Sequence, residues 1–465
     1  MRYISTRGQA PPVSFLDAVL NGMAPDGGLY VPESWPVLPA SALEGSYADC
    51  AAAALKLLAG DDLSNAAAQE LCATAYSTDR WDDEGVALLV QIGPGESVLE
   101  LFHGPSLSFK DIAMQLIGPL YDYGLKQRDR RLTVVCATSG DTGGAAVEAL
   151  KNRDRVDLFV LTPAGRVSDV QRRFMTTSGA ANVFAIEVGG DFDACQSILK
   201  ALFADRDFAE RASLSAVNSV NWVRIAAQSV YYHLACDGTP EDEDVTFVVP
   251  TGNFGDAFSG YVAKQMGAPV GRIVLATNSN DLLTRALRTG RYERVAHSHA
   301  TASPAMDIQV ASNFERILFE ALGRDGAEVK RLYDEFARTG GFDIPAPALA
   351  ALRADFVSAS VDDEETLAAM RDAYEDSGDV ACPHTAVGFR ALEKIEGEEI
   401  YAPVIDLATA HPAKFPDTVE RATGIRPDLP AKCADLFSRS EKFDSLPADA
   451  EAVKQYIRER SRAWS

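Results

Sequence analysis

Short apolar runs alternate with longer amphipathic stretches from about Val98 onward. Several of the short runs are nearly continuous in apolar residues, which is typical of strands covered on both faces by helices. Strands that alternate with helices in this way predict an α/β fold with mainly parallel sheets. The predicted strands are Val98–Phe102, Leu132–Cys136, Leu158–Leu161, Val183–Val188, Val245–Val249, Ile273–Ala276 and Val404–Leu407, and the predicted helices include Asp111–Tyr123, Gly144–Asn152, Val167–Ser178, Phe192–Phe203, Asn221–Ala235 and Ala257–Met266.

The pattern differs at the N-terminus and in one later segment. Near the start of the chain, Gly- and Pro-rich turns precede Ala-rich helical stretches at Tyr47–Gly60 and Ser64–Tyr76. We therefore predict a mostly helical N-terminal module over residues 1–95. The segment Ser303–Glu399 is charged and helical but poor in strand-like runs, which favours an insertion or a helical cover.

Composition narrows the classes of function open to the chain. The 465 residues carry a net charge of −23, from 44 basic and 67 acidic side chains. Such a surface repels nucleic-acid backbones and anionic membranes, so we expect neither as a partner. The sequence holds no run of about 18 apolar residues, the length that a membrane-spanning helix needs. An anionic substrate would need a local basic pocket, because the overall field opposes its approach.

The cysteines and the first residues bear on redox state and location. Seven cysteines are scattered along the chain without CxxC spacing, and their number is odd. We therefore expect reduced thiols, with neither a disulfide framework nor a metal site. The first residues hold no long apolar segment, so we expect no secretory signal and predict a cytoplasmic protein.

The first candidate for chemistry is Lys110, in the segment LFHGPSLSFKD (Leu101–Asp111). It lies among small, aromatic and turn residues, directly before an apolar helical run. A lysine is rarely placed there for packing, since its ammonium is strongly hydrated and its long side chain is costly to order. Where burial lowers its pKa, the neutral amine can form a Schiff base with an aldehyde. The alternative is a flexible surface lysine at a helix start.

The second candidate is the loop VPTGNFGD (Val249–Asp256), between a predicted strand and a predicted helix. Glycines in such a loop let backbone N–H groups approach a phosphate, and the helix dipole favours the anion. Asp256 then occupies the position expected for the N-cap of the helix. The alternative is an ordinary turn. The loop matches neither the Walker A motif nor GxGxxG, which disfavours ATP and dinucleotides.

Two further loops follow predicted strands. ATSGDTGG (Ala137–Gly144) offers hydroxyls, one carboxylate and three glycines, a set that suits a substrate carboxylate, a second phosphate or a plain turn. LATAHPAKF (Leu407–Phe415) brings a Thr, a His and a Lys together at the end of a strand. Ligands in open α/β sheets collect at that edge, so this loop is a candidate for ligand binding.

Together these segments resemble threonine synthases, which are pyridoxal-phosphate enzymes of fold type II, the tryptophan-synthase β-like fold. The resemblance covers nearly the whole chain in the family's order and is closest to the longer, bacterial and fungal type. HGPSLSFKD replaces the HGPTLAFKD that is common in the family, and the lysine is kept. The matching segments are PDGGLYVP (Pro25–Pro32), HGPSLSFKD (His103–Asp111), TSGDTGGAAVEA (Thr138–Ala149), GGDFDACQ (Gly189–Gln196), NSVNWVRIAAQ (Asn218–Gln228), PTGNFGDAFSGYVAK (Pro250–Lys264), ATNSNDLL (Ala276–Leu283), AMDI (Ala305–Ile308) and TAHPAKF (Thr409–Phe415).

The resemblance implies a fold and a cofactor site. It implies two open, mainly parallel α/β domains beside the N-terminal module, in a catalytic region over residues 96–465 whose smaller domain, at about 110–215, lies inside the larger one. Lys110 matches the catalytic lysine that binds the aldehyde of pyridoxal 5′-phosphate, and Thr409 matches the hydroxyl residue that faces the pyridine nitrogen. The residues that match the cofactor site are Lys110, Asp141, Gly252, Asn253, Phe254, Gly255, Asp256 and Thr409.

The resemblance also implies O-phospho-L-homoserine as the substrate and L-threonine and phosphate as products. Arg224 and Lys414 are the cations expected to hold the substrate phosphate. Two alternatives remain open, a related lyase that forms a 2-oxo acid and ammonia, and a catalytically silent binding protein. A monomer and a homodimer are both open. The candidate substrate residues are Ser139, Thr142, Asn221, Arg224 and Lys414.

Overall fold

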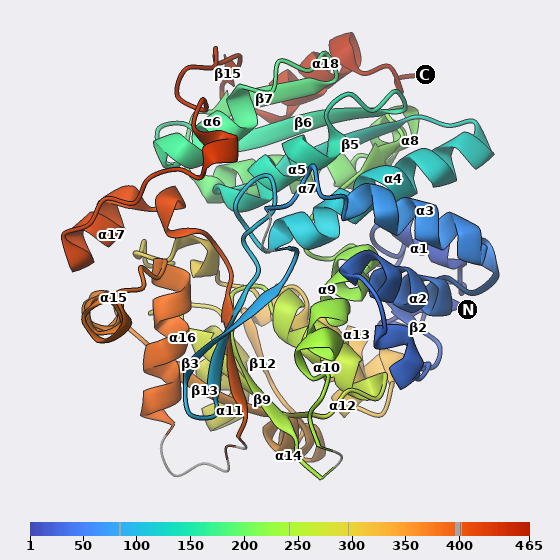
Figure 1. Cartoon of the computed structure of the whole chain (residues 1–465). Helices are drawn as coiled ribbons and strands as arrows, with labels where there is room; N and C mark the ends of the chain where they lie inside the picture. The colour runs from blue at the N-terminus through green and yellow to red at the C-terminus, as the bar shows by residue number, and fades with distance from the viewer. Residues whose placement is uncertain (83–84, 241, 296, 396–399, 401) are drawn as a thin grey trace.

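The computed structural model describes residues 1–82, 85–240, 242–295, 297–395, 400 and 402–465. Two sheets lie one above the other in Figure 1, each flanked by helices, and the N-terminal helices lie beside both. The larger sheet is the lower one in this view, and the smaller sheet with the C-terminus is the upper one. This arrangement agrees with the predicted α/β architecture.

The larger sheet contains six strands in the order β13-β10-β9-β14-β4-β3. Neighbouring strands run parallel, except that β3 pairs antiparallel with β4 at one edge. Alternate residues of β9 enter two different cores, with Phe247 and Val249 on one face and Val248 on the other. The strands are β3 (Leu88–Gly93), β4 (Glu96–Glu100), β9 (Val245–Pro250), β10 (Val270–Thr277), β13 (Phe356–Ser360) and β14 (Val404–Ala408).

Helices cover both faces of this sheet, which is why its central strands are mostly apolar. The cover on the Phe247 face includes α9 (Trp222–Ala235) and α10 (Gly255–Gln265), while α16 (Pro383–Lys394) packs on the Val248 face. Further helices in this half are α11 (Leu282–Thr289), α12 (Phe314–Ala321), α13 (Gly326–Thr339), α14 (Ala346–Asp355), α15 (Asp363–Ser377) and α17 (Pro416–Thr423), with the short strands β11 (Arg291–Glu293) and β12 (Gly341–Asp343).

The smaller sheet is entirely parallel, in the order β15-β7-β6-β5-β8. Val134 and Val160 belong to the core that is shared with the larger sheet, whereas Val135 and Phe159 form a second core on the outer face. The strands are β5 (Leu132–Ala137), β6 (Val156–Pro163), β7 (Val183–Val188), β8 (Leu214–Ser215) and β15 (Asp444–Leu446), and the helices are α4 (Lys110–Arg128), α5 (Asp141–Leu150), α6 (Asp169–Thr176), α7 (Phe192–Ala204), α8 (Arg206–Arg211) and α18 (Ala450–Arg460).

The N-terminal helices pack against both halves through α4 and α9. Buried hydrogen bonds of Tyr3 connect α2 to α9. The Tyr3 hydroxyl donates to the Leu58 carbonyl at 2.9 Å and accepts from the Trp222 indole at 3.0 Å. Ser46 and Ser64 cap the two longer helices, as short hydroxyl side chains do at helix starts. The elements are β1 (Tyr3–Ser5), β2 (Tyr30–Pro32), α1 (Phe15–Asn21), α2 (Tyr47–Ala59) and α3 (Asn65–Ala75).

All seven predicted strands are present, but the structure has strands that the pattern did not predict. The segment from Ser303 was expected to be poor in strands, yet β13 pairs with β10 at the edge of the larger sheet; residues 396–399 lie outside the described residues. β13 was missed because FVSAS is short and partly made of small residues. β3 pairs with β4, so the last part of the predicted module 1–95 joins the larger sheet, and that domain boundary stays a prediction.

Candidate functional site

One cavity lies where loops from both sheets meet. β9, β14 and β4 are neighbours in the larger sheet, and the segments that follow each of them reach this cavity, as does the start of α5 after β5. It therefore lies at the carboxyl ends of parallel strands, where open α/β sheets bind ligands. The lining residues are Phe109, Lys110, Asp141, residues 250–257, Ala305, Met306, His384 and Thr409.

Lys110 is the first residue of α4, and the loop before it is fixed by two sets of hydrogen bonds. The carboxylate of Asp111 accepts from the Ser106 backbone N–H at 2.8 Å and from the Ser106 hydroxyl at 2.7 Å. The Phe109 N–H donates to the Thr409 carbonyl at 2.9 Å. Lys110 and Thr409 are therefore held at the same cavity although they lie far apart in the sequence.

The amine of Lys110 is buried beside a carboxylate that it shares with a second lysine. Its Nζ lies 3.5 Å from Oδ2 of Asp141, and Nζ of Lys414 lies 2.7 Å from Oδ1 of the same carboxylate. Burial lowers the pKa of Lys110 to about 8, with Arg224 and Lys414 acting in the same direction and Asp141 opposing them. Lys110 can therefore change its protonation state near neutral pH.

Asp141 is ionised in this environment. Burial opposes its charge, but Lys414, Lys110 and His384 outweigh that effect and hold the pKa of Asp141 well below its usual range. Its Oδ1 also accepts a hydrogen bond from the Gln171 amide at 2.8 Å. Asp141 is thus a buried carboxylate that holds two ammonium groups in place.

The glycine loop after β9 closes the other side of the cavity. Gly252 has no room for a side chain, because a Cβ there would lie 2.8 Å from the carbonyl oxygen of Ala305. The side chain of Asn253 accepts from the Gly255 N–H at 2.8 Å and so shapes the turn. Among the described residues, no protein group accepts from the N–H groups of Gly252, Asn253 and Phe254. Such unpaired donors before a helix start fit a phosphate.

The prediction that Asp256 caps the following helix was wrong. Phe254 occupies the N-cap, with a φ of 67° in the left-handed region, and α10 begins at Gly255. Asp256 lies in the first turn, where its carboxylate accepts hydrogen bonds from Tyr231 and, at 2.9 Å, from Tyr232. Burial raises the pKa of Asp256 to about 6. Helix α9 therefore holds the start of α10 through this carboxyl group.

All of the predicted cofactor residues line this cavity, whereas the predicted substrate residues do not. Ser139 and Thr142 are half-buried at the start of α5, and their hydroxyls have no hydrogen-bond partner in the described parts of the chain. They remain available to a ligand. Lys414 reaches the cavity only through Asp141, and it also donates to the Ser106 carbonyl at 2.7 Å.

Asn221 is fully committed to holding the structure. Its side-chain oxygen accepts from the Val223 N–H at 3.2 Å and caps α9. Its amide nitrogen donates to the Val19 carbonyl at 2.9 Å and to the Tyr121 hydroxyl at 3.2 Å. Asn221 therefore has a structural role and has no amide group left for the substrate.

Arg224 is buried without a partner in the described structure. It is 3 % exposed, and its Nε makes no hydrogen bond. Arg316 is equally buried, yet its guanidinium bonds to the carbonyls of Tyr30 and Val220 at 3.0 and 2.7 Å. Burial lowers the pKa of Arg224 to about 10. A buried, unpaired guanidinium is costly unless an anion accompanies it.

His384 was not predicted from the sequence. It lines the cavity from the start of α16, and its Nε2 accepts from the Ala305 N–H at 3.2 Å. This hydrogen bond holds the turn that lies against Gly252. Burial lowers the pKa of His384 to about 4, so its ring is neutral near pH 7. No local pattern signals this contact, because it joins two segments of a region that was expected to be a cover.

Other classes of site find no support in the described residues. None of their helices is both long and apolar enough to cross a membrane. Their His, Cys, Asp and Glu side chains form no group of three that could hold a metal ion. The seven cysteines are buried and free.

Three family models match the chain and together cover most of it. The model "Threonine synthase N terminus" matches residues 2–76, "Pyridoxal-phosphate dependent enzyme" matches 98–405, and "Threonine synthase, C-terminal" matches 385–457. The second of these alone covers more than half of the chain. Their order along the chain is that of the motifs quoted above.

Relatives match over nearly their full length. A threonine synthase of Pseudomonas aeruginosa is 44% identical over 98% of both chains, and one of Saccharomyces cerevisiae is 39% identical over 98% of this chain and 97% of that one. Among solved structures, a PLP-bound threonine synthase from Brucella melitensis has a TM-score of 0.94 and 46% identity over 100% of both chains. The yeast threonine synthase structure has a TM-score of 0.90 and 38% identity, covering 99% of this chain and 98% of that one.

Proposed function

Because the chain belongs to the threonine synthase family, we propose that it converts O-phospho-L-homoserine and water to L-threonine and phosphate, the last step of threonine biosynthesis. It would act as a carbon–oxygen lyase. The observation that carries the proposal is Lys110, a buried lysine with a pKa of about 8 that lines the same cavity as a glycine loop whose N–H donors have no partner among the described residues. A cytoplasmic location, a monomeric or homodimeric state and the division into residues 1–95 and 96–465 remain predictions.

The cavity fits pyridoxal 5′-phosphate, the cofactor of this family. The N–H groups of residues 252–254 suit its phosphate, the amine of Lys110 suits its aldehyde, and the hydroxyl of Thr409 suits its pyridine nitrogen. Asp256 stabilises the phosphate loop through its tyrosine partners on α9. When bound, the cofactor supplies an electron sink for charge that develops at the substrate Cα.

The remaining chemistry is assigned to this chain's own side chains. Lys110 takes the proton from Cα, because a pKa of about 8 lets it accept and return protons at neutral pH. Asp141 keeps the amines of Lys110 and Lys414 together at the cavity wall. The hydroxyls of Ser139, just before α5, and of Thr142, in its first turn, are assigned to the substrate carboxylate.

Substituting valine for Gly252 should weaken cofactor binding without unfolding the protein. Its side chain would meet the Ala305 carbonyl, since even a Cβ would lie 2.8 Å from that oxygen, and the loop would shift its donors away from the phosphate. Cofactor retained after dialysis, read from its visible absorbance, should fall sharply. The matched control is Gly93→Val on β3, outside the cavity lining, where a Cβ would lie no closer than 3.6 Å to its neighbours. If Gly252→Val keeps its cofactor as the wild type does, the phosphate binds elsewhere, and the loop Ala137–Gly144 is the next candidate.

Arg224→Ala should lower kcat/KM for O-phospho-L-homoserine by about tenfold to a hundredfold. One charge-assisted contact to the substrate phosphate is worth roughly 1.5–3 kcal/mol. Retention of the cofactor should not change, because its phosphate is assigned to the loop at 252–254. Steady-state kinetics and the cofactor absorbance of the same sample separate the two effects. Turnover at wild-type efficiency would show that other groups hold the substrate phosphate.

The decisive test of the function is identification of the amino-acid product. Purified holoenzyme is incubated with O-phospho-L-homoserine, and phosphate, threonine, ammonia and 2-oxo acid are all measured. Threonine in equal amount to phosphate supports the proposal. A 2-oxo acid with ammonia would identify the related lyase activity, and no release of phosphate would favour a silent binding protein.

A further inference from the structure

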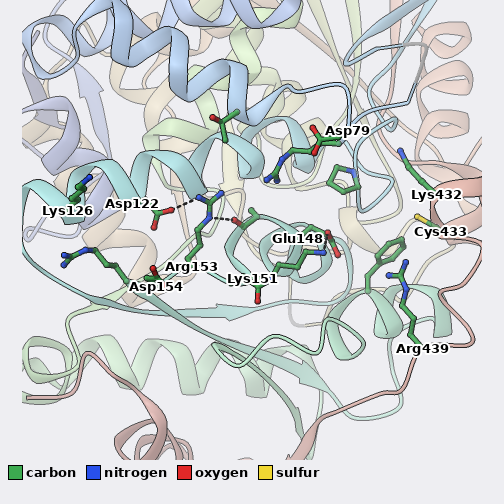
Figure 2. A pocket seen from close by; sticks show the side chains of 17 residues that line it. Asp79, Asp122, Lys126, Glu148, Lys151, Arg153, Asp154, Lys432, Cys433 and Arg439 are labelled. Carbon is green, nitrogen blue, oxygen red and sulfur yellow. Dashed lines mark hydrogen bonds and ion pairs between the residues drawn. The ribbon is translucent and has the colours of Figure 1, made fainter.

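A second, larger cavity lies away from the site described above. Figure 2 shows this cleft from close by. Its volume is about 880 Å³, which is within the range of roughly 300–1,000 Å³ typical of small-molecule sites. Its walls come from the end of α3, from α4, from the end of α5 and the turn after it, from α6 and from the C-terminal segment at 432–439. The two cavities share no lining residue in the described structure.

The cleft is basic although the protein is strongly acidic. Seven cationic and four acidic side chains line it, in a chain that carries a net charge of −23. In Figure 2, Lys126, Asp122 and Arg153 lie at one end and Lys432 and Arg439 at the other. The cationic lining residues are Arg80, Lys126, Lys151, Arg153, Arg155, Lys432 and Arg439.

Two of these cations lack a carboxylate partner within ion-pair distance in the described structure, namely Arg80 and Lys126. Arg80 donates to the side-chain oxygen of Gln115, a neutral group, and Lys126 is exposed. The other five are held in place by carboxylates at 2.6–3.1 Å, and they retain further N–H donors for a ligand. The pairs are Lys151–Glu148, Arg153–Asp122, Arg155–Asp129, Lys432–Asp82 and Arg439–Asp435.

The cleft contacts the loop that positions Lys110. Pro105, in that loop, lines the cleft directly. Phe174 and Cys433 also line it, and they pack with Leu107 of the same loop in one small apolar cluster. A group bound in the cleft would therefore contact the loop that leads to Lys110, directly at Pro105 and through the apolar cluster around Leu107.

A direct polar link joins the cleft to the same loop. The amine of Lys432, at one end of the cleft, donates to the His103 carbonyl at 2.5 Å and to Asp82 at 2.8 Å. An anion that draws Lys432 toward itself would weaken the bond to His103, at the start of the loop. The cleft is thus connected to the active-site loop by both packing and a hydrogen bond.

We propose that this cleft binds a small polyvalent anion bearing phosphoryl or carboxylate groups, and that its occupancy acts on catalysis through the loop at 103–109. Cations at both ends of the cleft suit a ligand with separated negative groups. The ligand would also join the N-terminal helices, the smaller sheet's helices and the C-terminal segment, which all contribute walls. Binding in the cleft does not depend on which reaction the other cavity catalyses, because the two cavities share no lining residue in the described structure.

The test is calorimetric titration of the holoenzyme with inorganic pyrophosphate and, separately, with citrate, at constant ionic strength. The two arms distinguish phosphoryl from carboxylate recognition. The double variant Arg80→Ala/Lys126→Ala should bind the preferred anion at least about tenfold more weakly, because it removes the two uncommitted cations. Lys330→Ala, which removes a half-buried cation on α13 outside the cleft lining, is the matched control and should bind as the wild type does.

Two further measurements decide the proposal. The preferred anion should change kcat/KM of the wild type and should change that of the double variant much less, while the thermal stability of both proteins is compared to detect misfolding. The single variant Lys126→Ala, at an exposed position, should show the same trend if the double variant folds poorly. Absence of binding by both anions overturns the proposal, and so does binding that the substitutions leave unchanged.

Discussion

Replacing Lys110 by alanine should reduce turnover of O-phospho-L-homoserine by at least about a thousandfold. The side chain is assigned both the attachment of the cofactor and the removal of the Cα proton, and proton transfer by a positioned group alone contributes about 10²–10⁴-fold. The fold should survive, because only Asp141 lies within ion-pair distance of this amine among the described residues. Steady-state kinetics and thermal unfolding give the two readouts.

The assignment can be checked without activity. Borohydride treatment of the wild-type holoenzyme should attach the cofactor covalently, and peptide mapping should find it on Lys110. Lys264→Ala is the matched control, because Lys264 is a half-buried residue of α10 that pairs with Asp355 at 2.8 Å and lies outside the cavity lining. This variant should be labelled and active. Label found on another lysine would falsify the assignment of Lys110.

The sequence carried enough information to predict the architecture and to bring the candidate cofactor residues to one cavity, because strands and glycine-rich loops are local signals. β5, β6 and β9 are buried at every position, so their apolar runs were readable. The cofactor residues follow strands in short motifs rich in glycine, and the parallel order of the strands brings the ends of those motifs together. This topology explains why one cavity is lined by Lys110, Asp141 and Thr409.

What could not be predicted depends on contacts between distant segments. The Ala305 N–H donates a hydrogen bond to His384, and the two residues lie in separate segments of a region whose hydrophobic pattern is weak. Arg224 lies on a regular helix, and only the structure shows that its guanidinium is buried without a partner among the described residues. The role of Asn221, in contrast, could have been predicted from the sequence. An asparagine directly before an apolar helix is typical of an N-cap, and this is the role that the structure shows.

Asp141→Asn should have the second large effect, on both Lys110 and stability. Asp141 favours the charged form of Lys110, so without it the pKa of Lys110 should fall below about 8. The change also leaves two buried ammonium groups without a carboxylate, and breaking a buried ion pair in this way costs about 3–5 kcal/mol. The pH dependence of amine labelling at Lys110 in the cofactor-free protein, and the free energy of unfolding, are the measurements.

The stability difference should depend on pH with a definite sign. The pKa of Asp141 is depressed in the folded protein, so its contribution is fully present above the unfolded pKa of about 4 and is lost as pH falls through the folded value. The gap in stability between wild type and Asp141→Asn should therefore not close between pH 7 and about pH 5. In that range the lowered pKa of Lys110 in the variant can only widen it as pH falls, and the gap should begin to shrink only below about pH 4. A gap that already closes near pH 6 would mean that Asp141 is not held as a carboxylate.

Two variants separate the effect on Lys110 from a general loss of structure. Asp157→Asn removes another buried carboxylate, one that pairs with Arg462 at 2.7 Å on β6 and lies outside the cavity lining. It should lower stability and leave the labelling profile of Lys110 unchanged. Adding Lys414→Met to Asp141→Asn should recover part of the lost stability, because it removes a stranded charge. If Asp157→Asn shifts the profile as much as Asp141→Asn, the carboxylate does not act on Lys110 directly.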